Sequence, residues 1–203
     1  MDDCYIPAYN PVLILVLSGK RKSGKDFVAE LLKERMGIQK SVIIRLSGPL
    51  KEQYAKEHQL DYSRLLDATE YKEFYRTDMI LWGEEIRRKN PGYFCYHALL
   101  QQNADKKPVW IVSDARRKTD ITFFRTNYPC ATKTVRVSAT LETRKSRGWV
   151  FTPGVDDVES ECGLDDVQDW DFVIKNDGDD ILLNDGIQPI LDLGVKRISL
   201  DNV

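Results

Sequence analysis

The clearest chemical signal is a loop rich in glycine and lysine near the N-terminus. It reads Gly19-Lys20-Arg21-Lys22-Ser23-Gly24-Lys25, a glycine followed by four residues and then Gly-Lys. Glycines let the backbone curl so that successive N–H groups face one centre, where they bind phosphate oxygens. The spacing therefore predicts a phosphate-binding loop in which Lys25 reaches the β- and γ-phosphates of a nucleotide.

The residue after this loop departs from the usual pattern. Asp26 stands where a serine or threonine hydroxyl commonly binds magnesium. A carboxylate is also a good ligand for a hard cation, directly or through water. Asp114, which follows a later strand, stands where a second carboxylate near the metal is usual. We therefore predict a Mg²⁺ site with Asp26 and Asp114, although each acid also suits the start of a helix.

Further cations follow other expected strands. The adjacent guanidinium groups of Arg116 and Arg117 suit an acceptor phosphate, because arginine binds phosphate in a bidentate way. Lys51 is expected in the first turn of a helix, where the dipole disfavours a cation unless a phosphate is bound. Arg144 and Arg147 share one helical face and suit a mobile lid over transferring phosphates. A plain solvated role remains open for each of these residues.

These residues need a parallel sheet to bring them together. Strand-like runs alternate with helical segments, which predicts an α/β fold of three layers, with about five parallel strands covered by helices on both faces. The expected strands are 12–17, 42–46, 109–112, 134–138 and 172–174, and the expected helices include 25–36, 71–86 and 93–102. Each polar cluster follows a strand or begins the next helix, as ligand sites of such sheets do.

Composition excludes several classes of protein. The 203 residues are 42% hydrophobic and 31% charged, which excludes a disordered chain and leaves room for one domain with a lid. The longest apolar run has six residues, so no spanning helix is expected. We also expect no secretory signal at the acidic N-terminus and no peroxisomal tripeptide at residues 201–203, which favours the cytosol.

The cysteines and histidines are not spaced as metal or redox pairs, so we expect neither a zinc site nor a disulfide framework. They are Cys4, Cys95, Cys130, Cys162, His58 and His97.

Charge is distributed unevenly along the chain. Residues 156–185 hold 12 acidic residues and one basic residue, which leaves 29 basic (30 − 1) and 20 acidic (32 − 12) elsewhere. A basic body suits phosphorylated small molecules or nucleic acid, but the aromatic residues of a single-strand binder are missing beside the basic clusters. We therefore expect no nucleic-acid partner, and we expect the acidic stretch to be a solvated face.

Several longer strings resemble phosphomevalonate kinases of the animal type. They are 19–26 (GKRKSGKD), 47–54 (SGPLKEQY), 82–85 (WGEE), 113–117 (SDARR) and 147–157 (RGWVFTPGVDD). The resemblance covers about residues 13–176 and implies a P-loop kinase fold similar to nucleoside-monophosphate kinases, with a lid. It also implies phosphoryl transfer from ATP, with Mg²⁺, to (R)-5-phosphomevalonate in the mevalonate route to isoprenoids and sterols.

The resemblance also assigns roles at matching positions. The residues it implies for ATP are Gly19, Lys20, Arg21, Lys22, Ser23, Gly24, Lys25, Asp26, Arg147 and Asn176. Those it implies for the phosphorylated acceptor are Lys51, Arg87, Arg116, Arg117 and Asn176. The expected catalytic residues are Lys22, Lys25, Arg144 and Arg147. Arg76 and Arg136 match family arginines without a defined role, and the segment after Asn176 follows the family poorly.

The expected organisation is a single domain over 1–203, with a core at about 12–140 and 170–203. A helical acceptor-binding region is expected at about 50–105, and a lid at about 141–165. We expect a monomer that binds neither membrane nor nucleic acid. A kinase of the same fold acting on a nucleoside monophosphate and a non-catalytic nucleotide-binding protein remain alternatives. A GTP switch would need an Asn-Lys-x-Asp motif, which the sequence lacks.

Overall fold

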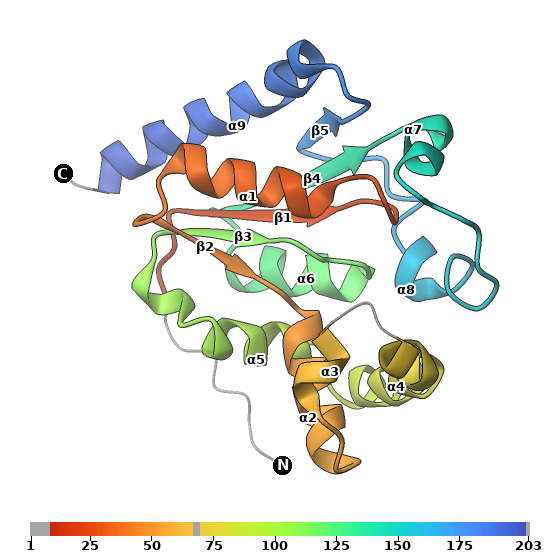
Figure 1. Ribbon diagram of the computed structural model, residues 1–203. Coiled ribbons are helices and arrows are strands. Elements are labelled where there is room, and N and C mark those ends of the chain that lie inside the picture. Colours follow the sequence, from red (N-terminus) through yellow and green to blue (C-terminus); the bar gives the residue numbers. More distant parts are fainter. Residues whose placement is uncertain (1–8, 67–69, 202–203) are drawn as a thin grey trace.

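A five-stranded parallel sheet forms the centre of the protein. The computed structural model describes residues 9–66 and 70–201 (Figure 1), so Cys4 and residues 202–203 lie outside the described chain. The strands are β1 (Leu13–Ser18), β2 (Ser41–Ile44), β3 (Val109–Val112), β4 (Thr132–Ser138) and β5 (Phe172–Lys175). All pair in parallel in the order β2-β3-β1-β4-β5, which confirms the predicted α/β sheet with small shifts at strand ends.

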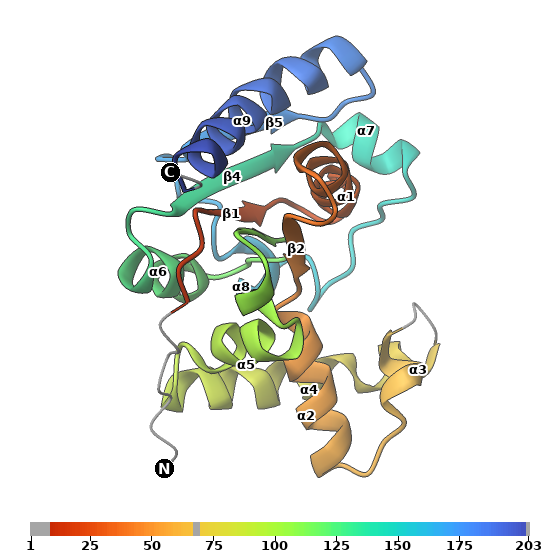
Figure 2. The same ribbon diagram turned by 90° about the vertical axis from the view of Figure 1, so that its left-hand side faces the viewer.

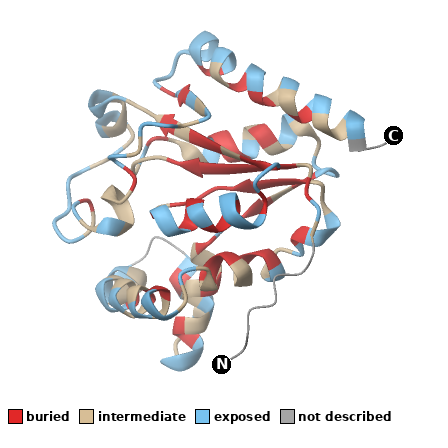
Figure 3. Ribbon diagram, turned by 180° about the vertical axis from the view of Figure 1, so that it is seen from behind, coloured by how far each residue is buried: buried red, intermediate tan, exposed pale blue. Residues whose placement is uncertain are grey.

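Helices cover both faces of this sheet. Helices α1 (Lys25–Met36) and α9 (Asp180–Asp201) lie on one face, and α5 (Tyr93–Gln101) and α6 (Lys118–Asn127) lie on the other (Figures 1 and 2). Residues 13–17 of β1 are fully buried and alternate between the two resulting cores. A strand with helices on both faces is apolar throughout, which explains the continuous hydrophobic run. Figure 3 shows the buried strands between helices whose outer sides are exposed.

The remaining helices lie beside and beyond the sheet. Helices α2 (Ser47–Glu57), α3 (Tyr62–Leu66) and α4 (Glu70–Lys89) pack around a third, small core (Figure 2). The predicted helical stripe at 71–86 therefore lies on α4, which ends before Asn90. A short 3₁₀ turn, η1 (Ala104–Lys106), precedes β3.

Two short helices follow β4 and lie near the phosphate loop. They are α7 (Leu141–Ser146) and α8 (Glu159–Cys162), within the segment that we predicted as a lid. Within residues 9–66 and 70–201, no helix combines the length and the apolarity needed to cross a membrane.

The central strand gives a test of the packing. Leu15 is fully buried between the sheet and α1, whereas Leu200 on α9 is 68% exposed. We expect Leu15→Ala to lower the free energy of unfolding by about 2–5 kcal/mol, because it leaves a cavity in a close-packed core. Urea unfolding measures this loss. Leu200→Ala, the matched surface variant, should change it by less than about 0.5 kcal/mol. Equal losses in the two variants would contradict this account of the core.

Candidate active site

The predicted phosphate loop connects β1 to α1 and is tightly curled. Lys22 and Gly24 have left-handed backbone conformations, with φ of 63° and 83°. A Cβ on Gly19 would lie 2.6 Å from the Val137 carbonyl oxygen, and one on Gly24 would collide with Asn176 Nδ2. Close packing therefore requires both glycines, and the positive φ of Gly24 adds a second reason at that position.

The loop ends at the N-terminus of α1, where free N–H groups and the helix dipole favour an anion. Lys25 is the first residue of this helix, and its side chain is 14% exposed. Its Nζ lies 3.3 Å from Oδ1 of Asp26, whose side chain is 67% exposed. The structure thus places a cation and an accessible carboxylate beside a site suited to phosphate.

Arg144, Arg147 and Asn176 hold the loop from one side. Arg144 Nε donates to the carbonyl oxygen of Arg21 at 2.8 Å. Arg147 donates to the carbonyl oxygens of Ser23 at 3.2 Å and of Asn176 at 2.8 Å. Asn176 is 6% exposed, and its Nδ2 donates to the Ser23 carbonyl at 2.9 Å. Arg147 and Asn176, predicted for the nucleotide, therefore come together with the predicted catalytic residue Arg144, and each binds the loop backbone.

A second group of cations lines a cavity of ≈ 290 Å³ beside the loop. The predicted acceptor residues Lys51, Arg87, Arg116 and Arg117 all line it. Arg21 of the loop and Arg76 of α4 line it too, so the cavity joins the predicted nucleotide and acceptor residues. Asn176, also predicted for the acceptor, lies against the loop instead.

Two of these arginines are buried and paired with carboxylates. Arg87 Nη1 lies 2.6 Å from Asp120 Oδ1, and Arg117 pairs with Glu84. Both arginines are 7% exposed, and the Nε of each is buried with no hydrogen-bond partner among the residues that the structure describes. A buried donor without a partner costs about 1–3 kcal/mol. Each arginine therefore keeps one buried donor that no described residue satisfies.

Lys51 lies in the second turn of α2, because that helix begins at Ser47. Our expectation of a first-turn position is therefore wrong, because Lys51 lies just beyond that turn. Burial, followed by the nearby charge of Lys72, lowers the pKa of Lys51 below its ordinary value. A phosphate bound in the cavity would raise this pKa again, since an adjacent anion favours the charged ammonium.

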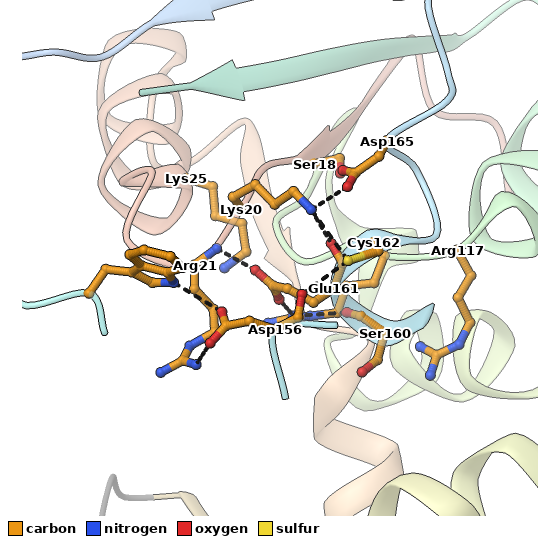
Figure 4. Close-up of polar contacts among 12 residues, drawn as sticks. Ser18, Lys20, Arg21, Lys25, Arg117, Asp156, Ser160, Glu161, Cys162 and Asp165 are labelled. Carbon is orange, nitrogen blue, oxygen red and sulfur yellow. Dashed lines mark hydrogen bonds and ion pairs between the residues drawn. The ribbon is translucent and has the colours of Figure 1, made fainter. Parts of the chain in front are cut away.

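Glu161 of α8 reaches between the two groups of cations (Figure 4). Its carboxylate accepts the backbone N–H of Arg21 and pairs with the guanidinium of Arg116. Its side chain is only 3% exposed. A carboxylate therefore occupies donors of the phosphate loop and of the predicted acceptor site together.

Two more acids of this segment bind loop cations. Asp156 Oδ2 lies 2.6 Å from Arg21 Nη1, and Asp165 pairs with Lys20 (Figure 4). The side chain of Asp156 is 4% exposed. The expectation of a solvated acidic face is thus wrong for Asp156 and Glu161, because the loop cations attract them into the site.

The two predicted metal ligands differ in their surroundings. Both oxygens of Asp114 accept backbone N–H groups, from Leu46 at 2.7 Å and from Ser47 at 3.0 Å. Residues 9–66 and 70–201 contain no cluster of three or more His, Cys, Asp or Glu side chains that could hold a metal ion. Mg²⁺ beside a nucleotide is usually bound by one or two carboxylates together with phosphate oxygens and water. Asp26 fits that mode, whereas Asp114 joins β3 to the start of α2.

Five carboxylates of the site were not predicted from the sequence, and they are Glu84, Asp120, Asp156, Glu161 and Asp165. Asp120 and Glu84 hold the buried arginines, and Glu161 holds the loop. A signal existed for Asp120, which lies three residues after Arg117, where an acid often binds the first N–H groups of a helix. Glu84 belongs to a string that carried the family resemblance, but it had no assigned role.

Comparisons with known proteins agree on fold and family. The crystal structure of TT1252 from Thermus thermophilus has a TM-score of 0.50 and 16% identity, covering 90% of this chain and 97% of that one, and supports the fold alone. Phosphomevalonate kinase of Drosophila melanogaster is 47% identical over 167 residues, which cover 81% of this chain and 88% of that protein. A family model described as phosphomevalonate kinase matches residues 17–130, more than half of the chain. On these two sequence matches, the chain belongs to the phosphomevalonate kinase family.

Proposed function

We propose that this chain brings ATP and (R)-5-phosphomevalonate together in the cavity between the phosphate loop and Arg116–Arg117. Family membership gives phosphomevalonate kinase activity in the mevalonate pathway of isoprenoid and sterol biosynthesis. The products are (R)-5-diphosphomevalonate and ADP. The supporting observation is that Arg21 of the loop and the predicted acceptor cations line one cavity.

The chemistry needs alignment more than proton removal. The acceptor is a phosphate monoester, so its oxygen is already a nucleophile and needs no strong base. Two polyanions must approach in line, and the main obstacle is their repulsion. We propose that Lys22, Lys25, Arg144 and Arg147 neutralise charge on the transferring group.

Acceptor binding uses the cations on the far side of the cavity. We propose that Lys51, Arg87, Arg116 and Arg117 bind the acceptor phosphate. Their positions in the lining of one cavity support this role. We propose that the loop residues and Asn176 bind ATP. Asn176 would act indirectly, because it donates a hydrogen bond to the Ser23 carbonyl and so holds the loop.

Mg²⁺, when bound, would neutralise charge on the nucleotide phosphates. Asp26 is the carboxylate that we propose to hold it, because its side chain is exposed beside Lys25. Asp114 would act on the ion through water, since both its oxygens accept backbone N–H groups. We also propose a monomer, because one chain supplies both groups of cations, and we propose the cytosol as its location.

The acidic segment must move for phosphates to bind. Glu161 accepts the same kind of N–H group that a phosphate oxygen would use, and it pairs with Arg116 of the acceptor site. We propose that ATP displaces this carboxylate, so residues of the predicted lid act as an internal anion in the free enzyme.

Acceptor choice gives the direct test of the assignment. Coupled ADP release should be strong with (R)-5-phosphomevalonate and near background with AMP, CMP, UMP or no acceptor. The physical reason is that the cavity presents lysine and arginine donors for an acceptor phosphate, and its described lining residues include no aromatic ring to stack on a base. Turnover with a nucleotide alone would overturn the acceptor assignment while leaving the phosphate loop intact.

Lys25 gives the test of the loop. Lys25→Met should lower kcat by at least about 100-fold, because it removes a charge that stabilises the transferring group. Lys33→Met on the same helix is the matched control, since Lys33 pairs only loosely with Glu30 at 3.9 Å. Circular dichroism should show that both variants are folded. Wild-type turnover by folded Lys25→Met would refute the role of the loop.

Glu161 gives the test of the internal anion. Glu161→Gln should tighten ATP binding about tenfold, because the neutral amide competes less well for donors than a carboxylate. Calorimetry without acceptor measures the Kd, and exposed Glu159→Gln on the same helix should leave it unchanged. Weaker ATP binding by Glu161→Gln would show that the carboxylate helps to bind ATP rather than opposing it.

A further inference from the structure

A buried carboxylate lies behind the proposed acceptor arginines. Asp120, the third residue of α6, is 1% exposed. Its Oδ1 lies 2.6 Å from Arg87 Nη1, and its Oδ2 accepts the backbone N–H groups of Arg116 at 3.0 Å and Arg117 at 3.1 Å. One side chain therefore contacts three of the four residues that we assign to the acceptor.

These contacts join separate parts of the chain. Arg87 comes from the last turn of α4, whereas Arg116 and Arg117 lie between β3 and α6. Only the two backbone contacts of Asp120 are needed to cap α6, because they satisfy N–H groups at the start of that helix. The ion pair with Arg87 is a separate feature, and it fixes the distance between α4 and the double arginine.

The chemistry at this point requires a charged carboxylate. Arg87 is 7% exposed, and a buried guanidinium needs a partner because its desolvation is costly. The two backbone N–H groups belong to a helix N-terminus, which also favours an anion. Asp120 does not line the cavity, whereas Arg87, Arg116 and Arg117 all do. Its effect on a ligand must therefore pass through the arginines.

We propose that Asp120 is a positioning residue for the acceptor phosphate. It orients the Arg87 guanidinium and the Arg116–Arg117 backbone so that their remaining donors converge on one anion. This inference rests on the acceptor role that we propose for these arginines. The hydrogen bonds of Asp120 go to the acceptor arginines and not to the phosphate loop, so we expect its main effect on the acceptor.

The test separates acceptor from nucleotide. Asp120→Asn should raise the KM for phosphomevalonate about 10- to 100-fold, since small displacements of binding groups cost that much. The Kd for ATP should change less than twofold. Asp120→Glu, which keeps the charge but moves the oxygens by one carbon, should also raise this KM. It provides the same test if Asp120→Asn does not fold.

A structural carboxylate elsewhere provides the control. Asp171 accepts the Thr134 backbone N–H and hydroxyl, each at 2.8 Å, where β4 meets the segment before β5. Asp171→Asn should lower stability without changing the KM for phosphomevalonate. An equal loss of stability in Asp120→Asn with an unchanged KM would refute the proposal and leave Asp120 a helix cap.

Variants of the arginines distinguish failure of this inference from failure of the acceptor assignment. Arg87→Met should raise the KM for phosphomevalonate. In the double variant with Asp120→Asn, the increase in KM should be smaller than the product of the two single increases, because the effects of contacting residues are coupled. Multiplicative effects would show that Asp120 does not act through Arg87. If Arg87→Met and Arg117→Met both leave this KM unchanged, the acceptor assignment itself is wrong.

Discussion

Positive charges gathered at one edge of the sheet repel one another, and the site depends on the carboxylates that hold them in place. Five of the cations at the site have an acidic partner. The pairs are Lys20–Asp165, Arg21–Asp156, Arg87–Asp120, Arg116–Glu161 and Arg117–Glu84. Without such partners, buried guanidinium groups would be strongly destabilising. The binding site is thus assembled as a network of ion pairs before any substrate enters.

The pairs differ in which elements supply the acid. Asp120 and Glu84 lie on the long helices α6 and α4, which pack as part of the body of the protein. Asp156, Glu161 and Asp165 lie in or beside the short helix α8, in one continuous segment. The first group suits a permanent framework for the acceptor arginines. The second group can be exchanged for phosphate oxygens if that segment moves.

The sequence alone predicted most of the fold. Buried strands such as β1 read as continuous apolar runs, and Gly24 together with Lys25 marks where a loop becomes a helix, so these elements follow from local patterns. Most cations of the site were predicted because they follow a strand or begin the next helix, whereas Arg87, in the last turn of α4, was predicted only from the family resemblance. The predicted strand boundaries differ most from the observed ones for β2 and β4, because the ends of these strands depend on neighbouring strands rather than on local composition.

The acids that pair with those cations could not be predicted in this way. Asp120 lies 33 residues from Arg87, and Glu161 lies 140 residues from Arg21. Local spacing carries no information on such contacts, which form only when the sheet brings distant segments to one edge. The prediction that Lys51 lies in the first helical turn was wrong for a simpler reason, because α2 begins earlier than the pattern indicated.

Pairing of the site cations has a consequence for how substrates arrive. A cleft lined by free positive charges projects a field into solvent and speeds the encounter with anions. Here the carboxylates of Asp156, Glu161 and Asp165 cancel much of the charge of the loop and of Arg116. Long-range attraction is therefore weaker than the number of cations at the site would otherwise produce, and short-range exchange of partners contributes to discrimination among cellular anions. Only a ligand that offers several well-placed phosphate oxygens can replace these carboxylates.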